Sequence, residues 1–293
     1  MSQHLVTLPI LIPMIGALAL LLFNQASDTR RRQLSTALCV AQVLVAAWLL
    51  AVAGGGQMLF YALGNWHAPF GIVLMLDRLS ALMLILTAVL ALGSVLFACA
   101  GEDARGTNFH GLFQLQLMGL NGAFLTGDMF NLFVFFEITL LASYALMMHG
   151  GGKERIGAGL HYVILNLAGS ALFIVALGVL YGATGTLNMA DMARRVAQMS
   201  GDQTALVTAG ALLLIVVFSL KAALLPLYFW LPRTYAAAPA PVAALFAIMT
   251  KLGLYAILRV QSLIFADTPV AESIIAWLWW AGLATIALAA VGV

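Results

Sequence analysis

Residues 126–141 read TGDMFNLFVFFEITLL, and the character of this stretch decides the class of fold. From Met129 to Met148 the chain carries a single charge, Glu137, in a run of phenylalanine, leucine and valine. About 20 apolar residues in a helix are enough to cross the roughly 30 Å hydrocarbon core of a bilayer. The stretch therefore predicts a membrane-spanning helix with a glutamate near its middle.

The rest of the chain has the same composition. Of its 293 residues, 63% are hydrophobic and 8% are charged, whereas a soluble domain is about 45–50% apolar and about 25% charged. The sequence thus predicts an all-α polytopic membrane protein. A formal net charge of +2 gives no indication of a nucleic-acid partner. Cys39 and Cys99 each lie alone in an apolar stretch, so we interpret both as packing residues, and any metal ligands are unknown.

Hydropathy and length predict nine membrane spans. Their approximate bounds are 5–23, 34–53, 73–100, 111–127, 129–148, 157–182, 205–231, 239–265 and 271 to the end of the sequence. The apolar stretch near the N-terminus is longer than the core of a signal peptide and lacks a basic flank, so we expect it to be retained as the first helix.

Basic residues in the loops predict the orientation, because cytoplasmic loops are enriched in lysine and arginine. With the N-terminus outside, the inner loops hold Arg30, Arg31, Arg32, Arg105, Lys153, Arg155 and Arg233. The outer loops hold Arg194 and Arg195, with Arg78 and Arg259 near outer helix ends. We therefore expect a multi-pass protein of the inner (plasma) membrane with its N-terminus outside.

The only long polar segment covers residues 185–203. The spacing of Met189, Met192, Val196 and Met199 in it favours a short amphipathic helix on the outer face. A solvated loop is the alternative interpretation.

Three charges lie deep in the predicted spans: Glu137 in the fifth, Lys221 in the seventh and Lys251 in the eighth. A charge at the centre of a membrane helix costs about 2.5–3.5 kcal/mol on insertion scales, and such residues usually pair and mark an ion or proton path. We interpret the three as a proton relay. The alternative is a static ion pair, which is a weak source of stability and leaves the second lysine unexplained.

The seventh span carries a helix breaker beside its lysine. In FSLKAALLPLYFWLP, residues 218–232, Pro226 cannot donate a hydrogen bond to the carbonyl of Ala222. The helix is therefore expected to kink or unwind there, and broken membrane helices form ion sites in transporters.

Further polar side chains are weaker candidates for the relay. Tyr144, Tyr228 and Tyr255 each follow one of the three charges at helical spacing, and His161 near the start of the sixth span can change its charge near neutral pH. Coincidence, or an ordinary local hydrogen bond, is the alternative for each. Asp77 and Asp128 lie close to predicted outer helix ends and are interpreted as boundary charges.

One long pattern resembles a known family. Residues 219–259, SLKAALLPLYFWLPRTYAAAPAPVAALFAIMTKLGLYAILR, resemble the core of the antiporter-like subunits shared by respiratory complex I and the Mrp-type (Pha-type) multisubunit cation/proton antiporters. The stretches TGDMFNLFVFFEI and WLPRTYAAAPAP look most like the D component of the Mrp type. The complex I relatives usually carry an acidic residue and a histidine where Arg233 and Tyr235 stand here.

The resemblance implies a fold of about fourteen helices with two inverted five-helix repeats, each with a broken helix. It implies that Glu137, Lys221 and Lys251 match the family's relay glutamate and lysines. Residues 1–110 would form the first three helices, 111–265 the first repeat, and 266–293 the start of a second repeat. On this basis we expect about nine of the fourteen helices, in a chain that stops early.

The resemblance also implies the activity. We expect a subunit of a Na⁺/H⁺ or K⁺/H⁺ antiporter, a secondary transporter without cofactors, whose partners are other membrane subunits, H⁺, Na⁺ or K⁺, and the lipid bilayer. Two alternatives stay open: a proton-pumping subunit of a quinone reductase or membrane hydrogenase, and a scaffold subunit that transports nothing.

Overall fold

The computed structural model describes residues 2–22, 27–200, 202–266 and 268–291, and it is almost entirely helical. The long helices are α1 (Leu8–Leu22), α2 (Asp28–Gly54), α3 (Arg78–Ala98), α4 (Phe109–Leu125), α5 (Met129–Met147), α6 (Lys153–Thr184), α8 (Asp202–Ala222), α10 (Ala240–Val260) and α11 (Pro269–Val291). Eight helices in these ranges are long and apolar enough to cross a membrane. The predicted all-α polytopic membrane protein is confirmed.

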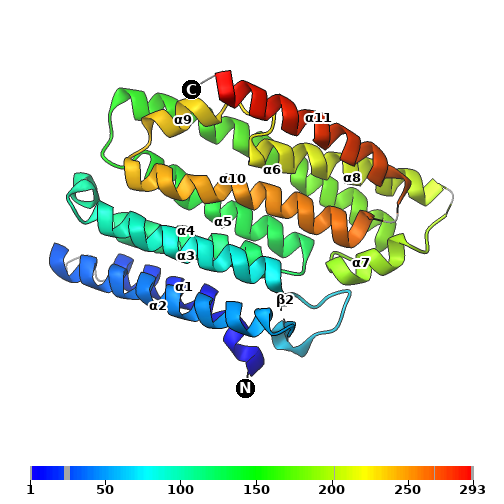
Figure 1. The fold of residues 1–293 in the computed structure, drawn as a ribbon, viewed down its shortest axis with the longest axis horizontal. Helices are drawn as coiled ribbons and strands as arrows, with labels where there is room; N and C mark the ends of the chain where they lie inside the picture. The colour runs from blue at the N-terminus through cyan, green and yellow to red at the C-terminus, as the bar shows by residue number, and fades with distance from the viewer. Residues whose placement is uncertain (1, 23–26, 201, 267, 292–293) are drawn as a thin grey trace.

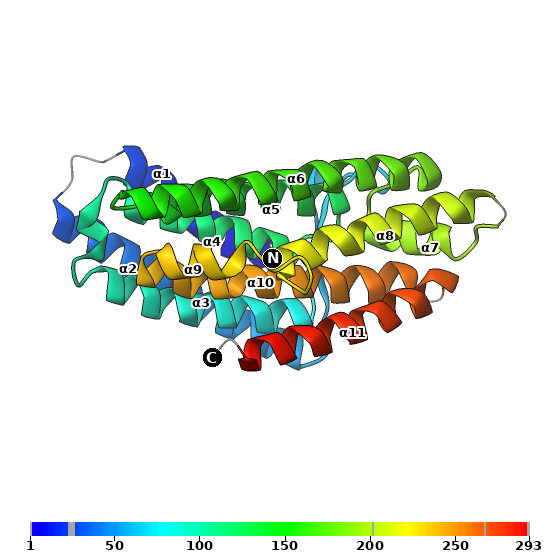
Figure 2. The same cartoon turned by 90° about the horizontal axis from the view of Figure 1, so that it is seen from above.

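The long helices lie side by side along one direction, as Figures 1 and 2 show. Helix α4 is at the centre, since 14 of its 17 residues are buried. Gly119 and Gly122 let it approach α5 closely: a β-carbon on Gly119 would overlap the Thr139 hydroxyl, and one on Gly122 would overlap the Phe135 ring. Helices α6 and α8 pack together beyond α5, and α10 packs against α8 and α3.

The third span was predicted to begin at residue 73, which is five residues before the start of α3. Residues 73–76 form strand β2 (Val73–Leu76), which pairs antiparallel with β1 (Leu59–Ala62), and α3 begins only at Arg78. The reason is a capping box: the Asp77 carboxylate accepts a hydrogen bond from the Ser80 backbone amide, and the Ser80 hydroxyl accepts one from the Asp77 amide. The apolar sequence of β2 is similar to that of a membrane helix, but the cap at Asp77 sets the start of α3.

Backbone hydrogen bonds join three loops at the end of the bundle where β2 lies. The amide of Gly127 donates to the carbonyl of Val73 (2.8 Å), and the amide of Met189 donates to the carbonyl of Gly127 (2.9 Å). The amide of Met129 donates back to the carbonyl of Leu187 (2.8 Å). We call the segments 73–76, 126–129 and 187–189 the loop belt. It connects the starts of α3, α5 and α7 (Met189–Val196).

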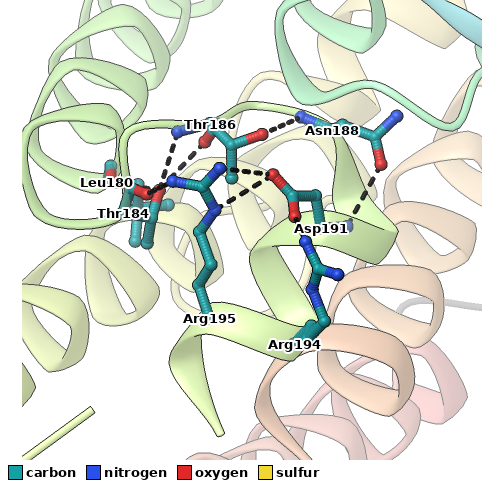
Figure 3. A network of polar contacts seen from close by, with 7 residues as sticks. All are labelled: Leu180, Thr184, Thr186, Asn188, Asp191, Arg194 and Arg195. Carbon is teal, nitrogen blue, oxygen red and sulfur yellow. Dashed lines mark hydrogen bonds and ion pairs between the residues drawn. The ribbon is translucent and has the colours of Figure 1, made fainter. Parts of the chain in front are cut away.

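The polar segment 185–203 contains α7, so the amphipathic-helix prediction is confirmed and the solvated-loop alternative is wrong. Met189, Met192 and Val196 are buried, and α7 packs on the π-helical turn η4 (Gln261–Phe265). Figure 3 shows the polar side of the helix, where the buried Asp191 carboxylate pairs with Arg195 (2.9 Å) and Arg194 (2.5 Å). The apolar face thus covers protein.

The predicted break in the seventh span is confirmed. Helix α8 ends at Ala222, Ala223 has a left-handed backbone (φ 55°), and the short helix α9 (Leu231–Ala237) follows a turn. The break starts three residues before Pro226, and backbone groups on both sides of it are hydrogen-bonded to side chains. The indole of Trp230 donates to the carbonyl of Leu220 (2.8 Å), and the amide of Leu225 donates to the hydroxyl of Thr285 on α11 (2.9 Å).

Candidate functional site

Lys221 lies at the end of α8, one residue before the helix breaks, and only 4% of it is exposed. Its ammonium group donates to three oxygens of α6: the Asn166 carbonyl (3.3 Å), the Asn166 side-chain oxygen (3.5 Å) and the Ser170 hydroxyl (3.3 Å). An ammonium group has three donors and no acceptor. All three of its hydrogens therefore have partners in a buried position.

Ser170 connects this lysine to Glu137. The Ser170 hydroxyl donates to the Glu137 carboxylate on α5 while its oxygen accepts from Lys221. A hydroxyl has one donor and two acceptor sites, so it can do both at once. The sequence predicted that Glu137 and a lysine would meet, and the structure brings Glu137 and Lys221 together through Ser170.

The positions of Asn166 and Ser170 on α6 explain the arrangement. They are four residues apart, so they lie on one face of the helix one turn apart, and both are buried. Gly169 beside them lets α8 approach, because a β-carbon there would lie 2.6 Å from Leu220 and 3.8 Å from the Lys221 side chain. Asn166 and Ser170 were not predicted as site residues, although two polar residues at this spacing in an apolar helix are a usable signal.

Aromatic side chains surround the three polar groups. The ring of Phe136 lies 5.9 Å from the Lys221 ammonium nitrogen. Tyr162, one turn before Asn166, is fully buried, shares a hydrogen bond with Ser143 (2.9 Å) and stacks on Trp230 at 5.3 Å. Tyr144, a weak relay candidate, packs edge-on against Tyr162 at 5.2 Å. It therefore belongs to the wall of the site.

The structure does not place Lys251 with the other two charges. Lys251 is exposed on α10, and its ammonium group donates to the Thr250 hydroxyl (3.4 Å). The reason is the contact two residues away: a β-carbon on Gly253 would lie 2.8 Å from the Lys221 carbonyl carbon, so Gly253 faces α8. At 3.6 residues per turn Lys251 is about 200° around the helix and points away from α8. The expectation of a buried Lys251 is wrong.

Tyr255 also has other partners than the sequence predicted. Its hydroxyl donates to the carbonyl of Phe124 on α4 (2.7 Å) and accepts from the Arg259 guanidinium (2.9 Å). Arg259 in turn makes a bidentate ion pair with Asp77 (2.5 and 2.9 Å). Asp77 is thus a helix cap and an ion-pair partner, and Tyr255 supports that pair.

The remaining candidates lie around the break or on α6. Tyr228 is half-buried and Pro226 exposed, both in the turn between α8 and α9. His161 is half-buried on α6 beside Tyr162, and it makes no hydrogen bond to any residue that the structure describes. Asp128 caps α5 by accepting from the Asn131 amide (2.8 Å); burial raises the pKa of its carboxyl, and hydrogen bonds from the backbone oppose that rise.

The site lies inside the part of the chain that matches a known family. The family described as "NADH:quinone oxidoreductase/Mrp antiporter, TM" matches residues 126–292, which include Glu137, Ser170, Lys221 and the broken helix. The chain belongs to this NADH:quinone oxidoreductase/Mrp antiporter family.

Relatives of this antiporter-family chain are named as D subunits of antiporters. The chain is 50% identical over 298 residues to the D subunit of a probable K(+)/H(+) antiporter of Rhizobium meliloti (strain 1021), in a match that covers 99% of the chain and 55% of the relative. It is 42% identical over 280 residues to the D subunit of a Na(+)/H(+) antiporter of Bacillus subtilis (strain 168), covering 94% and 56%. The chain thus spans about half the length of these relatives, which are named as transporter subunits.

Two solved assemblies contain chains of similar structure. The Mrp complex from Dietzia sp. DQ12-45-1b has a chain with a TM-score of 0.82 and 32% identity, covering 90% of this chain and 49% of that one. The membrane-bound sulfane sulfur reductase, an archaeal respiratory membrane complex, has one with a TM-score of 0.85 and 32% identity, covering 93% and 56%. The resemblance deduced from residues 219–259 is confirmed.

Proposed function

We propose that this chain is a membrane subunit of a multisubunit cation/proton antiporter and moves protons through Lys221, Ser170 and Glu137. The observation that carries the proposal is the Ser170 hydroxyl, which accepts from a buried ammonium group and donates to a carboxylate. Intramembrane charges of this kind are rare and usually mark an ion or proton path.

The geometry supports a defined proton transfer. When Lys221 gives a proton to the Ser170 oxygen, Ser170 passes its own hydroxyl proton to Glu137, and no heavy atom has to move far. Lys221 then becomes a neutral amine and Glu137 a neutral acid, which removes two charges from the apolar interior. Reprotonation of Lys221 from the other side completes the transfer.

The helix break beside Lys221 supplies the polar surroundings that this step needs. At the end of α8 the regular helical hydrogen bonds stop: the Ser219 carbonyl accepts from the Leu224 amide (3.0 Å) and the Leu220 carbonyl from the Trp230 indole (2.8 Å). Irregular backbone at membrane depth is tolerated where it is buried in protein or lines a water-filled cavity. We assign the break to the route by which water reaches Lys221.

Lys251 belongs to a later step in this proposal. It lies on α10, two residues from the glycine that touches Lys221, but it faces away from α8. We therefore assign Lys251 to the later step that reprotonates Lys221 from the other side, through groups on the face of α10 that points away from α8. In this proposal residues 111–265 act as the first repeat of an antiporter fold and 266–293 begin the second.

The proposed setting is the inner (plasma) membrane, with the N-terminus outside as the basic loops indicate. The exchanged cation is Na⁺ or K⁺, since relatives are named for each. Exchange of the two cations in everted vesicles, measured on the complete complex, decides between them.

The experiment that tests the relay uses Glu137→Gln and Lys221→Ala in the assembled complex. Each variant is expected to abolish cation/proton exchange while the subunits still co-purify. Lys153→Ala, at the exposed start of α6, is the matched control and is expected to transport normally. Normal exchange in either relay variant would overturn the relay, and it would favour a scaffold subunit.

A second candidate function is a proton-pumping subunit of a redox-driven complex. The observation that favours it is the similarity to a chain of the sulfane sulfur reductase, with a TM-score of 0.85. The same relay would then be driven by electron transfer in other subunits. Redox subunits encoded beside this chain would favour the second candidate, and a compact set of small membrane proteins would favour the antiporter.

A further inference from the structure

A group of three possible metal ligands lies far from the relay, where α3 passes into α4. Cys99 follows the last residue of α3, Asp103 lies in the short helix η3 (Glu102–Arg105), and His110 lies in the first turn of α4. One possible ligand atom from each residue lies within 4.8 Å of the other two. Cys99 was interpreted as a packing residue because no possible ligands lie near it in the sequence, and the fold brings Asp103 and His110 to it.

His110 has a ring nitrogen available for a ligand. The residue is 6% exposed, and its Nε2 atom lies 3.0 Å from an Asp103 carboxylate oxygen. Its Nδ1 atom is buried and has no hydrogen-bond partner among the described residues. The two ring nitrogens point in different directions, so Nε2, which already faces Asp103, is the atom that would bind an ion in this cluster.

Arg32 holds the Asp103 carboxylate in place. Its guanidinium donates to both oxygens of Asp103, at 2.6 and 2.8 Å. Carboxylate ligands of metal ions are usually oriented by such an outer hydrogen bond. The neighbouring Arg31 forms its own ion pair with Asp28.

The cluster borders a polar cavity and a mostly apolar groove. A cavity of about 200 Å³ is lined by Asp103 and His110, together with Asp28 and Asn108. An open groove between α2 and α3 is lined by Cys99 and Arg32. Cys99 is half-buried and is a free thiol. An ion and its water ligand therefore have an entry path, which is one requirement of a metal site.

We propose that Cys99, Asp103 and His110 form a binding site for a zinc-class divalent cation, with water as the fourth ligand. A thiolate, an imidazole and a carboxylate are the side chains that bind Zn²⁺, and three protein ligands plus water is a common tetrahedral set. On binding, the Cys99 thiol loses its proton to solvent and the sulfur bonds to the metal. The nitrogen of His110 exchanges its contact with Asp103 for the metal.

The required movement is small. Ligand atoms around one tetrahedral Zn²⁺ lie about 3.3–3.8 Å apart, given bonds of about 2.0–2.3 Å. The ligand atoms of the three residues, which lie up to 4.8 Å apart, would thus have to move about 1 Å closer, by changes in side-chain torsion angles. The bound ion would fasten the end of α3 to the start of α4.

The test uses Co²⁺ as a spectroscopic substitute for Zn²⁺, with the full chain purified in detergent. We expect one equivalent of Co²⁺ to give a thiolate-to-metal charge-transfer absorption that Zn²⁺ removes by competition. Cys99→Ser is expected to abolish the absorption, and His110→Gln is expected to weaken Co²⁺ binding at least tenfold. The chain offers a matched control in its other cysteine, since Cys39→Ser should leave the absorption unchanged.

A second measurement does not depend on a variant that folds poorly. Zn²⁺ should slow the alkylation of Cys99 in the wild-type chain at least tenfold and raise its thermal unfolding midpoint, because a ligand that binds only the folded state stabilises it. Wild-type chain that folds but binds no Co²⁺ would overturn the proposal. An absorption that persists in Cys99→Ser would overturn it as well.

Discussion

Gly253 of α10 packs directly against the backbone of Lys221 in α8. A β-carbon at Gly253 would lie 2.8 Å from the Lys221 carbonyl carbon and closer still to the next backbone nitrogen. Contacts this short need a glycine, since backbone atoms cannot rotate away. The lysine of the proposed relay is thus positioned by a residue without a side chain.

Gly253→Ala is therefore expected to separate α8 from α10 near the lysine. Overpacking of this kind costs about 1–3 kcal/mol, so the apparent unfolding midpoint in detergent should fall and exchange should slow. Gly178→Ala on α6 is the control: among the described residues no atom outside its own helix lies within 4 Å of the added carbon, and helix propensity favours alanine by up to about 1 kcal/mol. Equal effects of the two changes would contradict the packing argument.

Ser170→Ala tests the hydroxyl between the two charges. The variant keeps Glu137 and Lys221 but removes the group that joins them. A hydrogen bond to a charged group contributes about 1.5–3 kcal/mol, so exchange should fall about tenfold or more while the complex still assembles. Ser262→Ala, on an exposed face of the turn after α10, should have no effect. Unchanged exchange in Ser170→Ala would mean that the proton takes another route.

Trp230→Phe tests what holds the helix break open. The indole hydrogen bond to the Leu220 carbonyl (2.8 Å) is lost, while an aromatic ring still packs on Tyr162. The Leu220 carbonyl keeps the Ala223 amide as a donor (3.1 Å), so the change removes one hydrogen bond, which contributes about 0.5–1.5 kcal/mol. We expect a lower unfolding midpoint and slower exchange in Trp230→Phe, whereas Pro226→Ala should keep the break, since the break begins at Ala223. A continuous helix in a structure of Pro226→Ala would show that proline is its cause.

The Asp77–Arg259 pair gives a prediction for pH. Burial alone would raise the pKa of Asp77, but hydrogen bonds from Arg259 and from the Ser80 amide outweigh burial, so the pKa of this carboxyl is lowered. A lowered pKa means that the pair stabilises the fold fully above the ordinary value of about 3.9, and that this stability is lost as the pH falls below it. Asp77→Asn leaves a buried arginine unpaired and should cost about 3–5 kcal/mol near neutral pH.

The measurement is the unfolding midpoint of the wild type and Asp77→Asn between pH 6 and pH 3. The difference between them should shrink as the pH falls through the acid range. Asp28→Asn is the control, because its ion pair with Arg31 is on the surface, where such pairs contribute at most about 1 kcal/mol. A difference that stays constant with pH would show that Asp77 acts only as a helix cap.

The helices and the pairing of Glu137 with Lys221 could be predicted because both depend on features of the local sequence. Runs of about 20 apolar residues specify membrane spans, and a glutamate and lysine in such runs must find partners. Ser170 and Asn166 were missed because the prediction followed the charged residues, and two neutral polar residues one helical turn apart are a weaker signal. They matter here only because Gly169 lets α8 come close.

The positions of Lys251 and Tyr255 relative to α8 were also not predictable, and the reason is different. Every face of these helices is apolar, so periodicity does not show which side of α10 meets α8. The contact at Gly253 decides it, and Lys251 follows on the far side. Likewise the cap at Asp77 sets the start of α3, although the apolar stretch of sequence begins at Val73. Cys99, Asp103 and His110 meet because a turn brings them together, which spacing alone did not indicate.

The loop belt also determines where this bundle can bend. Backbone hydrogen bonds tie the starts of α3, α5 and α7 to one another, so these helices cannot slide past each other at that end. Helix α8, in contrast, is interrupted beside Lys221 and resumes only as α9. The loop belt holds the helix starts together by backbone hydrogen bonds, whereas the helical hydrogen bonds of α8 stop next to Lys221. Because α11 contacts this interruption through Thr285, a displacement of α9 or α11 would act on the backbone next to Lys221.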